Sequence, residues 1–248
     1  MRLLITGLSG TLAPVLARAA RARGHRVLGL DHRLLRSLGP PAAARYLDAQ
    51  RPDGIAHLAM ANAQASAELA AWAARRHLPF VMTSTAMVFH HEPNGPHAVG
   101  DARNAVDDYG RGKVATEDAV AAAHPSASIV RIGWQIDPEA RGNNMLATLD
   151  EWQRTQGEVA ASRAWKPACS YMADTAEALL QLLVQPGVHH VDSNAAEGWT
   201  FAELVAALAR AHQRRHWRLR VHADHAHDQR LAGGERHVPP LSARLGTR

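Results

Sequence analysis

Short apolar runs alternate with stretches of helical spacing through the first half of the chain. Strands are predicted at 2–6, 25–30, 54–59, 78–83 and 128–132. Helices are predicted between them at 12–24, 42–50, 62–77 and 104–123, the first from apolar residues at Leu12, Val15, Leu16 and Ala19. This order of strand and helix is typical of an α/β fold with a Rossmann-like, doubly wound parallel sheet.

The regular alternation weakens after Pro138. Helices are predicted at 141–156, 173–184 and 200–212, with short strands at 188–191 and 217–221. We therefore expect a nucleotide-binding Rossmann domain over 1–165, with returning segments, and a small C-terminal substrate-binding lobe over 166–248. The boundaries of the two are expected to interleave.

The length of 248 residues and the apolar content of 46% suit one large α/β domain, or a nucleotide domain with a small lobe. The net charge is +5, and the excess is local, because residues 201–248 hold nine arginines against four acids. A basic segment can meet nucleic acid or the diphosphate of a nucleotide. No nucleic-acid-binding module accompanies it, so we favour the small anion and expect no nucleic-acid partner.

Cys169 is the only cysteine, which excludes an intrachain disulfide and agrees with a reducing compartment. No secretory signal pattern begins the sequence, and no apolar run approaches the length of a membrane span. We expect a cytoplasmic protein without a membrane partner.

A glycine motif follows the first predicted strand at Gly7-x-x-Gly10-x-x-Ala13. Glycines there let the backbone approach a pyrophosphate, and the N-terminus of the following helix supplies N–H donors and positive potential. An ordinary strand-to-helix turn is the alternative. The position between strand and helix favours a dinucleotide cofactor.

Asp31 follows the second predicted strand, about twenty residues after the glycines. An acid at this place accepts hydrogen bonds from the adenine ribose and repels a 2′-phosphate, so we favour NAD. Arg33 and Arg36 are close enough in sequence to accept that phosphate, which keeps NADP open. Asp31 is otherwise a loop carboxylate or a helix cap.

Tyr109 and Lys113 lie four residues apart, so a helix places both on one face. Lysine is rare in this chain, with two among 28 basic residues, and there are only three tyrosines, which argues against a chance pair. The hydroxyls of Thr83, Ser84 and Thr85 follow an apolar run, at the end of a strand where open α/β sheets bind ligands. A phenol, an ammonium and a hydroxyl brought together can protonate a carbonyl oxygen or deprotonate an alcohol.

Two other chemistries receive less support. The sixteen histidines, with several between 222 and 227, suggest metal ligands, but their spacing matches no specific site, so no metal is predicted. The sequence lacks the G-x-S-x-G turn that would indicate a serine hydrolase. Trp134 follows the strand at 128–132 and is either a ligand contact or a core residue.

Taken together, these motifs resemble those of the extended, or atypical, short-chain dehydrogenase/reductases of the NAD-dependent epimerase/dehydratase superfamily. The dTDP-4-dehydrorhamnose reductase (sugar-nucleotide-binding) branch is the most similar. The segments that carry this resemblance are Arg51-Pro52-Asp53, Ser84-Thr85-x-x-Val88-Phe89, Tyr109-Gly110-Arg111-x-Lys113, Arg131-x-x-Trp134 and Ser242-x-x-Leu245.

The resemblance implies an NAD(P)-dependent oxidoreductase that reduces or epimerises a nucleotide-linked sugar. Tyr109 would be the general acid or base, Lys113 would hold the nicotinamide ribose and lower the phenol pKa, and Thr85 would hydrogen-bond the substrate oxygen. The resemblance also implies cofactor contacts at Gly7, Ser9, Gly10, Thr11, Leu12, Asp31, His32, Ala59, Met60, Thr83, Tyr109 and Lys113. It implies substrate contacts at Thr85, Ala86, Met87 and Trp134.

The chain departs from this branch in two places. Ala86-Met87 stands where the branch has Asp-Tyr, which moves the segment toward epimerases and dehydratases. The region from Met60 to Glu68 is shortened, which puts the usual sugar contacts and a possible homodimer in question. A non-catalytic NAD(P)-binding regulatory or interaction protein on the same fold is therefore the alternative function.

Overall fold

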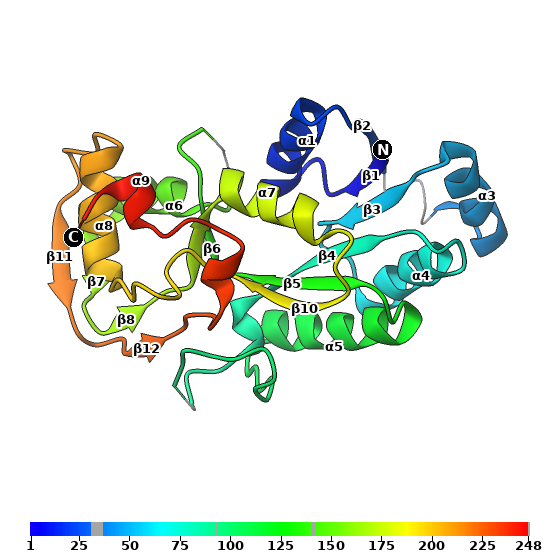
Figure 1. The fold of residues 1–248 in the computed structure, drawn as a ribbon. Helices are drawn as coiled ribbons and strands as arrows, with labels where there is room; N and C mark the ends of the chain where they lie inside the picture. The colour runs from blue at the N-terminus through cyan, green and yellow to red at the C-terminus, as the bar shows by residue number, and fades with distance from the viewer. Residues whose placement is uncertain (31–36, 93, 140–141, 248) are drawn as a thin grey trace. The chain divides into compact units, whose positions relative to one another are not determined.

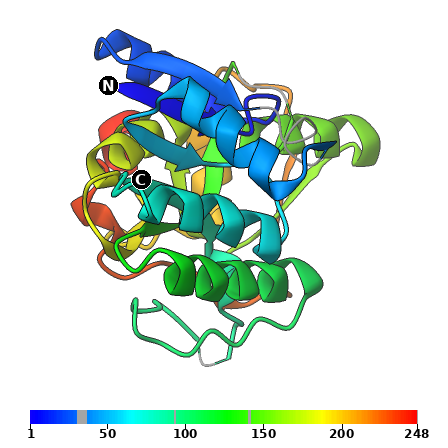
Figure 2. The same ribbon diagram turned by 90° about the vertical axis from the view of Figure 1, so that its right-hand side faces the viewer.

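The computed structural model describes residues 1–30, 37–92, 94–139 and 142–247 (Figures 1 and 2). By their packing they form two units. The first comprises Met1–Ser84, Asp107–Val130 and Ala176–His189, and the second comprises Thr85–Val106, Arg131–Thr175 and His190–Arg248. Each unit is thus assembled from three separate stretches of sequence. The division at residue 165 between a cofactor domain and a substrate lobe stays a prediction.

The first unit is built on a six-stranded parallel sheet with the order β10-β5-β4-β3-β1-β2. The strands are β1 (Arg2–Thr6), β2 (Arg26–Leu30), β3 (Gly54–His57), β4 (Phe80–Thr85), β5 (Ser128–Ile132) and β10 (Gly187–Val191). The helices are α1 (Leu12–Ala22), α3 (Pro40–Gln50), α4 (Ala63–Ala74), α5 (Asp108–Ala123) and α7 (Met172–Leu182). The carboxyl ends of β4, β5 and β10 and the start of α7 count with the second unit. The predicted Rossmann-like α/β fold is confirmed.

Helices cover both faces of this sheet. On one face α3, α4 and α5 pack against the strands (Figure 2). The core on this face includes Leu4, Ile55, Phe80, Trp72 and Val120. On the other face lie α1 and α7, joined by an ion pair between Arg23 and Glu177 (Figure 1). Strands covered on both faces need continuous apolar runs, which is why the sequence showed runs and not alternation.

The sheet reverses its winding between β1 and β3. The chain leaves β1 toward β2 at the edge, returns past β1 to β3, and then continues outward through β4 and β5. β1 pairs with both neighbours in parallel register, with Leu4 opposite Leu28 on one side and Ile55 on the other. Ligands of open α/β sheets bind outside the carboxyl ends of the strands at such a switch point.

The second unit combines short parallel strand pairs with helices. Its elements are η1 (Ala86–Val88), β6 (Trp134–Ile136), α6 (Met145–Gln156), β7 (Val159–Ser162), β8 (Trp165–Lys166), β9 (Cys169–Tyr171), α8 (Phe201–Ala211), β11 (Leu219–His222), β12 (His227–Asp228), η2 (Gly234–Arg236) and α9 (Ser242–Leu245). The pairs are β6 with β9, β7 with β11, and β8 with β12. Trp199 and Phe201 are almost fully buried in its apolar core with Ile136, Leu146 and Leu204.

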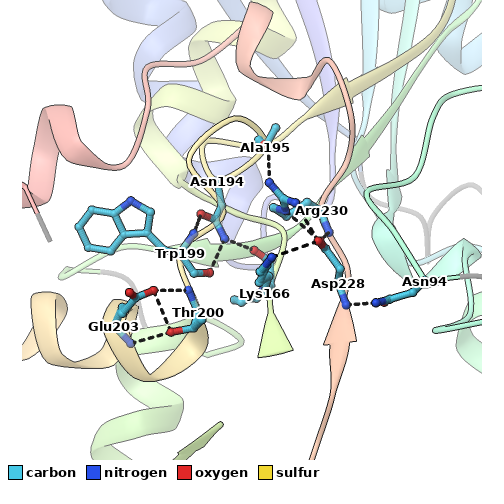
Figure 3. A network of polar contacts seen from close by, with 10 residues as sticks. Asn94, Lys166, Asn194, Ala195, Trp199, Thr200, Glu203, Asp228 and Arg230 are labelled. Carbon is cyan, nitrogen blue, oxygen red and sulfur yellow. Dashed lines mark hydrogen bonds and ion pairs between the residues drawn. The ribbon is translucent and has the colours of Figure 1, made fainter. Parts of the chain in front are cut away.

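Buried polar side chains fix the loops of the second unit (Figure 3). The Asn194 amide donates to the carbonyl oxygens of Pro167 and Trp199, at 2.8 and 2.9 Å, and accepts from the Trp199 amide at 2.7 Å. Nearby, Arg230 donates two hydrogen bonds to the Asp228 carboxylate, at 2.8 and 2.7 Å. In these loops, side chains supply hydrogen bonds to buried backbone N–H and C=O groups that a neighbouring strand would supply in a large sheet.

Some predicted boundaries were wrong by a few residues, each for a local reason. The strand predicted at 54–59 ends at His57, because the amides of Leu58 and Ala59 donate to the Thr6 hydroxyl and not to a neighbouring strand. The helix predicted from 104 begins at Asp108, because Asp107 caps it by accepting from the Gly110 amide at 2.8 Å. The strand predicted at 78–83 runs from Phe80 to Thr85. In the parts of the chain that the structure describes, no helix has the length and apolar character to span a membrane.

Candidate functional site

The turn after β1 requires glycine at Gly7 and leaves little room for a side chain at Gly10. Gly7 has φ +79°, and a Cβ added there would lie 2.9 Å from the backbone nitrogen of Ala59. Gly10 donates its amide to the Gly7 carbonyl at 2.8 Å, and a Cβ on Gly10 would lie 3.1 Å from the same oxygen. Ala13 is buried where α1 meets the sheet. The predicted glycine motif thus forms a tight turn at the switch point of the sheet.

No side chain caps the N-terminus of α1. Thr11 at the N-cap makes no side-chain capping bond, and the first turn has no acidic residue. Ser9 is exposed, and Thr11 and Leu12 are half-buried. Amides that Thr11 does not cap, together with the positive end of the helix dipole, make this turn suitable for an anion such as a pyrophosphate.

A chain of buried polar side chains, which was not predicted from the sequence, holds the turn after β3. The Thr6 hydroxyl accepts the amides of Leu58 and Ala59, both at 3.0 Å, and lies 2.9 Å from His57 Nδ1. His57 Nε2 lies 3.0 Å from the Ser66 hydroxyl on α4. β1, the turn after β3 and α4 are therefore linked at the same edge. The available signal was a polar residue, Thr6 or His57, that directly follows apolar residues within each of two predicted strands.

The fit at Gly7 can be measured with a matched glycine. Gly7 and Gly24 have nearly equal φ values, +79° and +76°, but only Gly7 has neighbours within 4 Å of an added Cβ. Gly24→Ala should cost about 1–2 kcal/mol of unfolding free energy for the left-handed backbone. Gly7→Ala should cost more and should weaken dinucleotide binding, because the turn must also move away from Ala59. Urea unfolding and cofactor titration of both variants test this, and equal effects would contradict the fit.

A cavity of about 690 Å³ lies between α3 and α4. Its walls are largely apolar and include Leu38, Ala44, Leu47, Met60, Leu69 and Trp72. Met60, a predicted cofactor contact, is 77% exposed in the turn after β3. The stretch between Met60 and Glu68 therefore borders a concave apolar surface of the first unit.

Tyr109 and Lys113 lie on one face of α5, as predicted from their spacing. The Lys113 ammonium donates to the carbonyl oxygen of Thr83 on β4 at 3.3 Å. It lies 5.9 Å from the centre of the Tyr109 ring, whose residue is 42% exposed. The first unit thus brings an accessible phenol and a tethered ammonium to the carboxyl end of a central strand.

The charge of Lys113 is under opposing influences. Burial lowers the pKa of the Lys113 ammonium, and the nearby Glu117 carboxylate raises it. Glu117 is only 2% exposed and follows Lys113 by one helical turn. Glu117 was not among the predicted site residues, although the sequence contains the spacing Tyr109-x-x-x-Lys113-x-x-x-Glu117.

The predicted substrate contacts belong to the second unit. The Thr85 hydroxyl accepts the Met87 amide at 3.2 Å, Ala86 is buried, and Met87 is 39% exposed. Trp134 is half-buried and packs against the core of that unit, 6.1 Å from Phe201 between ring centres. Their contact with a substrate stays a prediction. Asp31, His32, Arg33 and Arg36 lie outside the described residues, so the ribose contact and the choice between NAD and NADP stay predictions as well.

Several histidines gather in the second unit. The His227 ring lies 5.8, 6.4 and 6.1 Å from those of His91, His97 and His225. Burial, followed by the charges of the neighbouring rings, lowers the pKa of His227 to about 4, so the His227 ring is neutral near neutral pH. Within the described ranges, no three His, Cys, Asp or Glu side chains are placed to hold one metal ion.

Comparison with known proteins identifies the family. The model of the RmlD substrate binding domain matches residues 1–232. This chain belongs to the RmlD family. The expected resemblance to the dTDP-4-dehydrorhamnose reductase branch is thereby confirmed. One curated relative, the dTDP-4-dehydrorhamnose reductase of Mycolicibacterium smegmatis, is 31% identical over 211 residues. That match covers 76% of this RmlD family chain and 63% of the relative, so the chain spans less than two thirds of the relative's length.

Solved structures share the fold of this RmlD family member. The dTDP-4-dehydrorhamnose reductase of Bacillus anthracis, in complex with NADP, superposes with a TM-score of 0.82 at 18% identity, covering 99% of this chain and 97% of that one. The Bordetella bronchiseptica enzyme WbmH, in complex with NAD⁺, gives 0.75 at 17% identity and covers 100% and 92%. At these identities the likeness establishes the fold.

Proposed function

We propose that this protein is an NAD(P)-dependent reductase of a carbonyl group on a nucleotide-linked sugar. The observation that carries the proposal is the Lys113 ammonium, tethered to Thr83 of β4 and one helical turn from the accessible Tyr109 phenol. The same unit contains the glycine turn, so the groups for cofactor binding and for proton transfer share one scaffold. Relatives named as dTDP-4-dehydrorhamnose reductases support the class of substrate.

The residues present fit a dinucleotide. Gly7 and Gly10 keep free the space that side chains would fill, and the N-terminus of α1 has no capping side chain. We expect the pyrophosphate at this turn, contacted by Ser9, Thr11 and Leu12. Ala59, Met60 and the apolar cavity between α3 and α4 offer walls suited to an adenine ring.

A bound reduced nicotinamide supplies hydride to the carbonyl carbon. Tyr109 then donates its phenolic proton to the carbonyl oxygen, which becomes the hydroxyl of the product. The phenolate left on Tyr109 is stabilised by the positive charge of Lys113, and a proton from solvent restores the phenol. Thr85 remains the predicted hydrogen-bond partner of the substrate oxygen.

The reaction class has one close alternative within the family fold. Ala86-Met87 resembles the epimerase and dehydratase pattern, and in those reactions the same Tyr109 would first deprotonate an alcohol. Arginines of residues 201–248 would suit the diphosphate of either kind of substrate, apart from those already paired with acids, which are Arg214, Arg220, Arg230 and Arg244. Reduction remains our proposal because the curated relatives at 30–31% identity carry reductase names.

A non-catalytic role is the second candidate. The observation that favours it is the short path from β3 to α4, five residues from Leu58 to Asn62, together with the match to only 63% of the first relative. In that case the glycine turn would bind a cofactor while the protein served as a regulatory or interaction subunit. The catalytic proposal predicts turnover, which this candidate does not.

Titration with NADH and NADPH, followed by nicotinamide fluorescence, tests cofactor binding first. We expect the wild-type protein to bind NADH. Asp31→Ala should weaken NADH binding, because the hydrogen bonds from the carboxylate to the ribose are lost. The same variant should bind NADPH better, because the charge that repels the 2′-phosphate is lost. Oxidation of the bound cofactor by a panel of nucleotide-linked keto sugars then tests the reaction. Failure to bind either cofactor would overturn the proposal, and binding without any oxidation would favour the non-catalytic role.

A further inference from the structure

Three chemically different side chains follow one another along a single face of α5. Tyr109, Lys113 and Glu117 are each separated by four residues, about one helical turn. Exposure falls along this row, from the 42% exposed Tyr109 to the 2% exposed Glu117, with Lys113 between them. A carboxylate as buried as Glu117 is costly unless it interacts with positive charge or hydrogen-bond donors.

The Lys113 ammonium has a hydrogen-bond partner that carries no net charge. Its ammonium is held by the carbonyl oxygen of Thr83 at 3.3 Å, and a carbonyl supplies a dipole but no net charge. Burial favours loss of the ammonium proton. The charge of the buried Glu117, one helical turn away, acts on Lys113 in the opposite sense.

We propose that Glu117 is a positioning residue whose buried carboxylate keeps Lys113 charged and directed to the carboxyl end of β4. The carboxylate lies behind the ammonium on the helix, one turn farther from Tyr109, so it leaves the accessible end of the row to cofactor and substrate. Glu117 itself touches neither. It acts through Lys113.

The consequence for catalysis rests on the proposed function. A neutral Lys113 could not stabilise the Tyr109 phenolate or donate as strongly to a ribose hydroxyl. Removing the Glu117 charge should therefore limit activity to lower pH, because Lys113 would lose its proton earlier as the pH rises.

The chain offers a direct way to observe this, because Lys113 and Lys166 are its only lysines. Protein labelled with ¹³Cε-lysine gives two side-chain NMR signals, and Lys166→Arg assigns the Lys113 signal. In Glu117→Gln the titration midpoint of Lys113 should fall by about one pH unit or more. Asp118→Asn removes the same charge from the adjacent, exposed position and should leave the midpoint within a few tenths of a unit.

An unchanged Lys113 midpoint in folded Glu117→Gln would overturn the inference, as would an equal fall in Asp118→Asn. If the glutamine variant does not fold, Glu117→Met fills similar space without charge, and buried ionic groups often tolerate apolar replacement. The same midpoint then decides the question.

The NMR result is independent of turnover, which separates this inference from the proposed function. If the wild-type protein reduces a substrate, the alkaline limb of its pH–rate profile should shift to lower pH in Glu117→Gln, by the same amount as the Lys113 midpoint. Glu117→Asp should restore part of this shift. If the wild-type protein turns over nothing, the proposed function fails while the titration still tests Glu117.

Discussion

Tyr109→Phe should lower turnover by about 10²- to 10⁴-fold while cofactor binding stays near that of the wild type. The substitution removes the proton donor and keeps the ring beside the Lys113 ammonium. Because Tyr109 is 42% exposed, loss of its hydroxyl should change the free energy of unfolding little. Stopped-flow measurement of NADH or NADPH oxidation with an accepted sugar substrate gives the rate, and fluorescence titration gives the affinity.

Tyr46→Phe is the matched control, since it removes a phenolic hydroxyl from α3 in the same unit. It should retain nearly full turnover. A Tyr109→Phe variant that binds cofactor and keeps full biological activity would contradict the catalytic proposal and support the non-catalytic role. Equal losses in both tyrosine variants would indicate a general effect on folding.

Asn194→Ala should strongly destabilise the second unit. The side chain is fully buried and makes three hydrogen bonds to the backbone of Pro167 and Trp199 (Figure 3). Alanine leaves two carbonyls and one amide in the interior without these partners, so we expect a loss of about 3–5 kcal/mol in the free energy of unfolding. Urea unfolding followed by tryptophan fluorescence measures it, because every tryptophan except Trp72 belongs to the second unit.

Asn62→Ala provides the comparison, because Asn62 is exposed and accepts one hydrogen bond, from the Ala65 amide at the start of α4. Loss of this helix cap should cost about 1 kcal/mol. A similar small cost for Asn194→Ala would show that solvent or rearranged loops replace its bonds. A second unfolding transition would have to be assigned to its unit before the two costs are compared.

Much of the first unit could be predicted because its signals are local. A short apolar run followed by Gly7 and a helical pattern indicates one strand, one turn and one helix, whichever elements later surround them. Tyr109 and Lys113 needed only the periodicity of α5 to share a face. In the second unit the strands have two to four residues, and their buried groups are satisfied by side chains such as Asn194. Contacts of that kind leave no periodic pattern in the sequence from which they could be predicted.

By itself, the sequence determined the strand-and-helix order, the glycine turn and the Tyr109–Lys113 pair, since each depends on neighbours within a few residues. The tertiary structure decided what depends on distant segments. It placed Ala59 against Gly7, ended β3 early through the Thr6 hydroxyl, and tethered Lys113 to Thr83. It also revealed Glu117 as a buried charge behind Lys113. These features arise from burial and from hydrogen bonds between residues some 30 to 50 positions apart, which spacing along the chain does not encode.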